Sequence, residues 1–173
     1  NYHIILLAKN KTGWLNLIKL HNVSYYNFYY KPRITFEDLE KYSEGIIACS
    51  ACLGGVIPKM ILAQNMPKIK EYITKFKSIF KDDFYLELQD NNIAVNLILV
   101  QLAKKYNIKL IATNDAHYPH KDDSFAHEVM LCNQTHKKIS DTNRMNFETD
   151  EFYLKNTEEM RKAISYLGDG IFN

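Results

Sequence analysis

The feature that most constrains the fold is an alternation of short β-prone runs with longer segments of helical period. Parallel neighbouring strands cannot be joined by tight turns, so strands separated by helices imply crossover connections. The alternation therefore predicts an α/β fold with a largely parallel sheet or barrel. The β-prone runs lie at residues 2–8, 45–50, 83–88 and 109–113, with a weaker one at 151–154.

Apolar residues at helical spacing predict the helices between these runs and the faces that they bury. Pro67 suits the first turn of one helix, and Asn156 with Glu159 has the pattern of a capping box that opens a last helix. The spaced apolar residues are Trp14, Leu17, Ile18 and Val23, then Ile69, Ile73, Phe76, Ile79 and Phe80, then Leu97, Leu99, Leu102 and Ala103.

Composition narrows the class of protein. The 173 residues carry 22 Lys+Arg and 20 Asp+Glu, a formal net charge of +2, which argues against a strongly basic grip on nucleic acid. This length predicts one domain with a hydrophobic core.

Three cysteines do not make a disulfide framework, and they favour a reducing, cytoplasmic setting. The apolar runs are too short for a membrane span, and the start at Asn1 suggests a piece of a longer protein.

The most informative local feature is an apolar strand at residues 109–113 that runs into the pair Asp115 and His117. Catalytic and metal-binding side chains gather at the carboxyl ends of strands in α/β barrels. Residues two apart in an extended segment point to the same side, so this pair could bind one metal ion or two neighbouring ones. The alternative, which the tripeptide alone favours, is that Asp115 caps a turn and His117 is an ordinary loop histidine.

A second candidate is the Cys-x-x-Cys pattern of Cys49 and Cys52, also at the end of an apolar strand. A zinc site of this type needs a second Cys or His pair, which the sequence lacks. A redox pair would normally open a helix in a thioredoxin-like unit, and the surrounding pattern does not require one. Two buried small side chains are the simpler interpretation, with Cys52 the better placed if one sulfur is a ligand. His3 is a third possible ligand. Without other information, the simpler interpretation is a half-exposed histidine of a strand.

Other features have open interpretations. His127 lies in a helical stretch, where it could line a site or cover apolar surface. The aromatic-basic segment 25–33 would suit single-stranded nucleic acid, but its composition equally describes a packed loop, which we favour. No Walker loop, dinucleotide fingerprint or Gly-x-Ser-x-Gly elbow occurs in the sequence, so nucleotide-cofactor and serine-hydrolase functions have no support.

Collinear motifs run through nearly the whole chain. They are HIILLAKN at 3–10, TGWLNL at 12–17, FYYKPRI at 28–34, SEGII at 43–47, SACLGG at 50–55, FYLELQ at 84–89, ATNDAHY at 112–118, HEVMLC at 127–132 and NRMNF at 143–147. Together they closely resemble the family of bacterial replicative DNA polymerase III alpha subunits. One departure is that the family's Gln-Thr-Gly-Lys segment reads Gln-Thr-His-Lys at 134–137 here.

The resemblance implies the later part of a polymerase-and-histidinol-phosphatase (PHP) domain, which is a distorted seven-stranded TIM-like β/α barrel, here truncated at its N-terminal side. It assigns residues 1–140 to the C-terminal portion of that domain, and 141–173 to its end and the connection toward the polymerase palm. The family's pocket holds a metal cluster with nine ligands, five of which are expected upstream of Asn1. The four that map onto this chain are His3, Cys52, Asp115 and His117.

In this family such a cluster activates water for attack on a phosphodiester and neutralises charge on the phosphate. The resemblance implies zinc, manganese or magnesium ions in the complete domain, with weak or absent binding when only four ligands are present. It also implies that the chain has no catalytic residues beyond the metal ligands. We expect the chain alone to be inactive, because nothing in it resembles the paired palm aspartates of a polymerase.

The leading hypothesis is a piece of a cytoplasmic DNA-directed DNA polymerase, a nucleotidyltransferase of DNA replication, whose PHP site is a metal-dependent 3′-5′ exonuclease in some members. Its partners would be DNA and other holoenzyme subunits, including the proofreading exonuclease subunit, with no membrane. The alternative is a non-catalytic scaffold that stabilises the polymerase and docks the proofreading subunit. A free-standing phosphoesterase for a small phosphate ester is a third, against which the polymerase motifs count.

Overall fold

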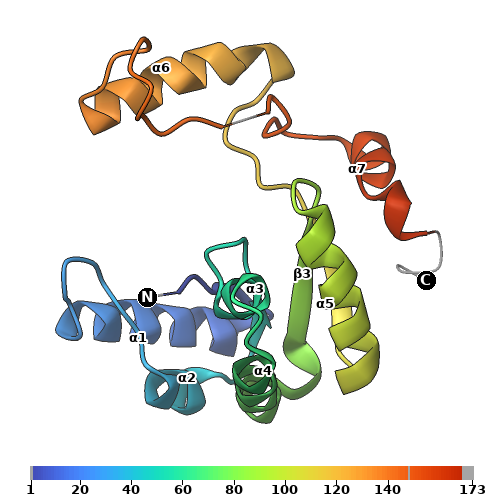
Figure 1. The fold of residues 1–173 in the computed structure, drawn as a ribbon. Helices are drawn as coiled ribbons and strands as arrows, with labels where there is room; N and C mark the ends of the chain where they lie inside the picture. The colour runs from blue at the N-terminus through green and yellow to red at the C-terminus, as the bar shows by residue number, and fades with distance from the viewer. Residues whose placement is uncertain (1, 148, 169–173) are drawn as a thin grey trace. The chain divides into compact units, whose positions relative to one another are not determined.

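The computed structural model describes residues 2–147 and 149–168 and is mixed α/β, as predicted (Figure 1). Its elements are β1 (Ile5–Ala8), α1 (Lys11–Tyr26), α2 (Phe36–Tyr42), β2 (Ile46–Cys49), α3 (Val56–Leu62), α4 (Met66–Phe80), β3 (Phe84–Gln89), α5 (Ile93–Tyr106), β4 (Lys109–Thr113), α6 (Ser124–Thr135) and α7 (Thr157–Ala163), with short 3-10 turns at Lys81–Asp83, Lys121–Asp123 and Ser165–Leu167.

The chain divides into two compact units, where its length alone predicted one domain. The first unit comprises the residues up to Leu88 together with Ala94–Ile111, and the second comprises Gln89–Ile93 together with the residues from Ala112 on. The boundary falls near the ends of β3 and β4. The residues immediately after these two strands therefore belong to the second unit, whereas those immediately after β2 belong to the first.

The four strands form one sheet in the order β1-β2-β3-β4. Strands β2 and β3 are parallel, as predicted, with Ala48 opposite Phe84. The prediction of a largely parallel sheet is wrong for β1, which pairs with β2 in the antiparallel sense. After α1 and α2 the chain returns to the end of β1, where the Lys9 N–H donates to the Gly45 carbonyl at 2.8 Å. Strand β2 therefore runs back alongside β1.

The core of the first unit lies between α4 and the sheet. The predicted face of α4 is confirmed, since Ile69, Ile73, Phe76 and Phe80 are all buried. The ring of Phe76 stacks on that of Phe84 in β3, with centroids 5.1 Å apart. Pro67 lies in the first turn of this helix, where its missing N–H costs no hydrogen bond.

The predicted buried face of α1 is wrong for Trp14 and Ile18, which are exposed, while Leu17 and Val23 are half-buried. Three of the four fully buried residues of the helix are small or polar. Helix α1 approaches the backbone so closely that a Cβ on Gly13 would lie 1.8 Å from the Gly45 carbonyl oxygen. The close backbone approach, and not the spacing of apolar residues, therefore determines which face of α1 is buried. Its residues are Gly13, Asn16, Leu20 and Ser24.

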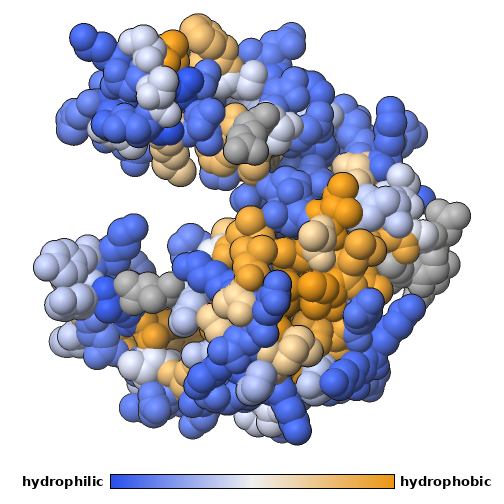
Figure 2. Space-filling view, in the orientation of Figure 1, coloured by the Kyte–Doolittle hydropathy of each residue, from blue (hydrophilic) through white to orange (hydrophobic). Residues whose placement is uncertain are grey.

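Helix α5 is apolar on more than its buried side. Leu99, Leu102 and Ala103 are buried as predicted, but Leu97, which we placed on the same face, is exposed. Figure 2 shows apolar side chains gathered on the surface over α3 and α5. A helix that is apolar all round is typical of one covered on several sides.

The aromatic segment at residues 25–33 is not a packed loop, contrary to our interpretation. Tyr26 and Tyr30 are 88% and 82% exposed, and the neighbouring aromatic rings are exposed as well. The Arg33 guanidinium lies over the Tyr29 ring, 4.7 Å from its centroid. Stacking surfaces are thus available to a ligand or partner.

In the second unit, the weak fifth strand is reduced to a single parallel bridge between Tyr118 and Tyr153. The capping box predicted at the start of α7 is confirmed, with Asn156 and Glu159 exchanging hydrogen bonds. Within the described ranges, no helix is long and apolar enough to cross a membrane.

Candidate metal centre

The loop that follows β2 is fixed to β3 by buried hydrogen bonds. The Ser50 N–H donates to the Tyr85 carbonyl at 3.1 Å, and the Ser50 Oγ accepts from the Glu87 N–H at 2.9 Å. Ala51 then adopts a left-handed conformation with φ 62°. Such a conformation is uncommon for a residue with a side chain and is often found at functional sites. This turn carries the chain away from the strand immediately before Cys52.

His3 and Cys52 are brought together at this loop. The His3 N–H donates to the Gly54 carbonyl at 2.9 Å, and the His3 Nδ1 lies 3.6 Å from the Cys52 Sγ. The Gly54 N–H also donates to the Cys52 Sγ at 3.4 Å. A Cβ on Gly54 would lie 2.5 Å from the His3 Nδ1. Glycine at this position therefore lets the imidazole reach the sulfur.

The separation of these two atoms fits a shared metal ion. Zinc lies about 2.3 Å from a cysteine sulfur and about 2.0–2.1 Å from a histidine nitrogen, so two such ligands at a tetrahedral angle lie about 3.6 Å apart. The Cys52 Sγ and the His3 Nδ1 are 3.6 Å apart. A thiolate and an imidazole are also the donor types that zinc prefers.

Cys49 has the opposite environment. It is 2% exposed at the end of β2, and burial, followed by the nearby Glu87 carboxylate, raises the pKa of its thiol to about 11. A metal ligand must be a thiolate, so Cys49 is chemically unsuited to that role at neutral pH. Its environment is that of a small buried hydrophobe, as predicted. The structure thus separates two cysteines that the sequence pattern treats alike.

Asp115 and His117 form a second pair just beyond β4. The Asp115 Oδ1 lies 3.6 Å from the His117 Nε2. The His117 N–H donates to the Phe152 carbonyl at 2.7 Å, which fixes the backbone. Around the His117 ring lie Phe147 and His127, with centroids 4.8 and 5.5 Å away. Carboxylate oxygen and imidazole nitrogen together suit several divalent metals, including zinc and manganese.

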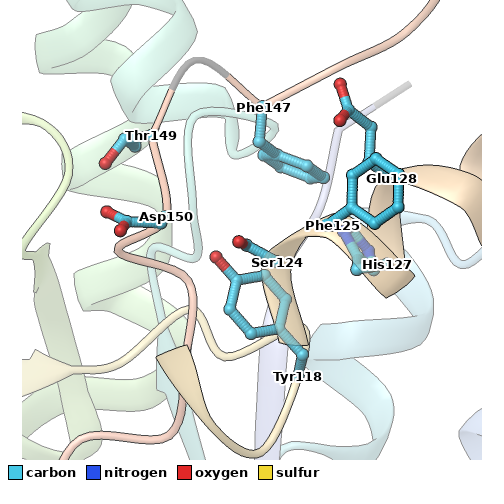
Figure 3. A pocket seen from close by; sticks show the side chains of 8 residues that line it. All are labelled: Tyr118, Ser124, Phe125, His127, Glu128, Phe147, Thr149 and Asp150. Carbon is cyan, nitrogen blue, oxygen red and sulfur yellow. The ribbon is translucent and has the colours of Figure 1, made fainter. Parts of the chain in front are cut away.

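An open pocket of about 340 Å³ lies beside this second pair (Figure 3). Thr149 and Asp150 lie across it from His127 and Glu128, which come from α6. His127 therefore lines a pocket, one of the two roles that the sequence left open. Burial, followed by His117, lowers the pKa of His127. The lining residues are Tyr118, Ser124, Phe125, His127, Glu128, Phe147, Thr149 and Asp150.

The predicted ligands thus form two pairs, one in each compact unit. His3 meets Cys52 in the first unit, and Asp115 meets His117 in the second. Across residues 2–147 and 149–168, no group of three or more His, Cys, Asp or Glu side chains has an arrangement that could hold a metal ion. Each pair by itself has two potential donor side chains, whereas a structural zinc site needs four ligands.

Sequence reasoning missed one polar cluster in the second unit. Lys155 and Asp90 form a buried ion pair, with Nζ and Oδ2 2.8 Å apart. The available signal was that Asp90, like Asp115, lies two residues after the end of a predicted strand. Nothing local marks Lys155, because its partner lies 65 positions away along the chain.

Comparison with known families agrees with these observations. The PHP domain model matches residues 1–91, more than half of the chain. The chain therefore belongs to the PHP domain family.

The more particular resemblance, to DNA polymerase III alpha subunits, is also confirmed. The chain is 47% identical over its whole length to the DNA polymerase III subunit alpha of Borreliella burgdorferi, covering 16% of that protein. It is 39% identical to that of Treponema pallidum over 99% of the chain, and 48% identical to that of Aquifex aeolicus over 86%. These matches span 15% and 13% of the two proteins. The chain thus corresponds to less than a fifth of each relative.

Proposed function

We propose that this chain is part of the alpha subunit of a bacterial replicative DNA polymerase III, a cytoplasmic DNA-directed DNA polymerase that acts with DNA and the other holoenzyme subunits. The similarity of the whole chain to alpha subunits supports this. Residues 1–140 would form the C-terminal portion of a seven-stranded PHP barrel. Residues 141–173 would complete that domain and lead toward the palm.

Within that protein, His3, Cys52, Asp115 and His117 would be ligands of divalent cations, with zinc or manganese best suited to their donor atoms. The observation that carries this assignment is the 3.6 Å separation of the Cys52 Sγ and the His3 Nδ1, beside a glycine that admits the ring. PHP domains are in general metal-dependent. The remaining ligands would come from residues outside this chain.

The reaction that such a site supports is hydrolysis of a phosphodiester at a 3′ end. A bound divalent cation would activate water and neutralise charge on the phosphate. The residues of the chain would provide a rigid frame. The Gly54 N–H donates to the Cys52 sulfur at 3.4 Å and helps to orient it. The His117 N–H donates to the Phe152 carbonyl, which fixes the backbone from which the ring extends.

The test uses the full-length polymerase and single-stranded DNA labelled at its 3′ end, with Mn²⁺ or with a chelator. His117→Ala and Cys52→Ser should each lower nucleotide release by more than about 100-fold, since loss of even an outer-shell partner costs 10- to 100-fold. Primer extension should be largely unchanged. His21→Ala, an exposed histidine of α1 outside both pairs, is the matched control. Release that is unaffected by chelator or by both ligand variants would contradict the proposal.

A second candidate, the non-catalytic scaffold, is favoured by one observation. Trp14, Leu15 and Ile18 are exposed apolar side chains on α1, and such groups are typical of protein interfaces. The scaffold hypothesis predicts that the wild-type polymerase releases no nucleotide from the 3′ end. It also predicts that Trp14→Ala weakens binding of the proofreading subunit, which the exonuclease hypothesis does not require.

A further inference from the structure

The most unusual charge in the second unit belongs to Lys155. Its side chain is 2% exposed, and the Asp90 side chain that it pairs with is 4% exposed. The Lys155 Nζ also donates to the Glu151 carbonyl and lies 3.3 Å from the Glu151 Oε2. Burial lowers the pKa of this amine, but Asp90 and Glu151 outweigh burial and raise it above its ordinary value. The amine is therefore a buried cation at neutral pH.

A buried ion pair of this kind is a poor stabilising device. Removing two charges from water costs free energy that their attraction often fails to recover, and apolar replacements are frequently as stable. In some proteins, buried polar groups instead fix a single geometry. The relevant question is then which groups the pair holds in place.

Lys155 bridges the ends of two strands. Asp90 immediately follows β3, and Asn114 immediately follows β4. The Lys155 side chain binds Asp90, while the Lys155 N–H donates to the Asn114 Oδ1 at 2.8 Å. Asn114 is the residue directly before Asp115. One lysine thus connects the end of β3 to the residue beside a proposed metal ligand.

The segment that ends at Lys155 also holds the backbone of the ligand pair. The Phe152 carbonyl accepts the His117 N–H at 2.7 Å, and the Leu154 N–H donates to the Tyr118 carbonyl at 3.1 Å. The side chain of Lys155 closes this segment on itself through Glu151 and anchors it to Asp90. Movement of the segment would therefore displace Asp115 and His117 together.

We propose that Lys155 is a positioning residue for the metal-ligand pair Asp115 and His117, acting through its buried ion pair with Asp90. This inference rests on the proposed role of that pair as ligands. It assigns no contact between Lys155 and the metal or the substrate. Its prediction is that the affinity of the pair for metal depends on the geometry of the Lys155–Asp90 bridge, beyond the stability that the bridge provides.

The test is a Zn²⁺ titration of the full-length polymerase with ¹⁵N-labelled histidine, because only that protein supplies all the proposed ligands. Coordination is followed by the ¹⁵N shift of the His117 ring, which is assigned by its absence from His117→Ala. The main variant is the double substitution Asp90→Leu with Lys155→Met, which removes the bridge without leaving a buried charge. We expect primer extension to be retained, which shows that the polymerase is folded. We expect the titration midpoint to rise about tenfold, the lower range for loss of a group that positions a metal ligand.

Two further variants complete the design. Asp90→Asn keeps an oxygen acceptor for the Lys155 Nζ, and we expect a smaller rise in the midpoint, of about threefold. Lys121→Met is the matched control, because Lys121 also pairs with Glu151, at 2.5 Å, but is exposed. Its midpoint should match that of the wild type.

The outcomes separate the inference from the function on which it rests. If the His117 ring of the wild-type polymerase does not shift with Zn²⁺, the ligand assignment fails and the inference fails with it. If the wild type shifts, and Asp90→Asn and the folded double variant shift at the same Zn²⁺ concentration, only the inference is overturned. Should the double variant not fold, Asp90→Asn decides the matter, with a raised midpoint supporting positioning and an unchanged one overturning it.

Discussion

Replacing Gly54 by alanine perturbs the His3–Cys52 pair with the addition of one methyl group. The new Cβ would lie 2.5 Å from the His3 Nδ1 and 2.9 Å from its Cε1. Ordinary contacts of a Cβ begin near 3.4 Å, so the imidazole must retreat by about 0.9 Å. His3 is exposed, and its ring can move with little cost to the fold.

That displacement is large for a metal site. Ligand distances must hold within about 0.2 Å of their ideal values, and a functional group within about 0.5 Å of its productive position. We therefore expect Gly54→Ala to weaken metal binding at Cys52 by about 10- to 100-fold, comparable to loss of an outer-shell partner. The free energy of unfolding should change by less than about 1 kcal/mol, the range of Gly→Ala changes at compatible backbone positions.

The assay is a Co²⁺ titration of the full-length polymerase, in which absorption of the cobalt–thiolate bond that is lost in Cys52→Ser reports coordination by Cys52. Gly55→Ala is the matched control, since its Cβ would lie 2.0 Å from the Ser50 carbonyl oxygen, a backbone atom. That variant should lose stability, measured by urea unfolding, because the loop itself must shift. Unchanged cobalt binding by folded Gly54→Ala would refute the reasoning that this glycine admits the His3 ring.

Three further predictions concern other positions. Cys52→Ser in the full-length polymerase should lower metal content, whereas Cys49→Ser should cost roughly 1–3 kcal/mol of stability and leave metal content unchanged; equal losses of metal would show the assignment to be wrong. Burial raises the pKa of Cys49 to about 11, so its contribution to stability is full below the unfolded pKa of about 8.5 and is lost as pH rises toward 11. In urea unfolding, the stability of the wild type should therefore fall more steeply with rising pH than that of Cys49→Ala. His136 ends α6 in the left-handed conformation, with φ 53°, so His136→Gly should raise stability by roughly 1 kcal/mol in urea, and a loss would contradict this.

The sequence predicted the elements better than their packing. The β-prone runs and the spacing of Ile69, Ile73 and Phe76 were sufficient for the strands and for α4, because hydrophobic periodicity records burial directly. Hydrophobic periodicity failed for α1, where a close backbone approach at Gly13 determines which face is buried. Apolar spacing carries no information about such an approach, which depends on a residue 32 positions away.

The candidate site was predictable in its members but not in its geometry. Local patterns favoured ordinary structural roles for His3 and for both cysteines, and only the collinear motifs joined them to Asp115 and His117. The structure gives a physical reason to prefer Cys52 over Cys49 as a ligand, because Cys49 is buried and Cys52 contacts His3. The Lys155–Asp90 bridge joins residues that are distant in the chain, so no local pattern announces it.

The resemblance at 134–137 illustrates how a sequence departure acquires a structural meaning. The position at which the family has glycine is His136, whose backbone closes α6 in the left-handed region that favours glycine. The Lys137 N–H still donates to the Cys132 carbonyl at 2.9 Å, so the helix terminates in the usual way. The substitution therefore preserves the turn and leaves a conformational cost at one residue.

The most direct test of the metal assignment is anomalous diffraction from crystals of the full-length polymerase containing zinc or manganese. If the four residues are ligands, an anomalous peak will lie about 2.0–2.1 Å from the His3 Nδ1 and about 2.3 Å from the Cys52 Sγ, with Asp115 and His117 also bound to metal. A site occupied by metal without Cys52, or a Cys52 side chain turned away from His3 in the metal-loaded protein, would contradict it.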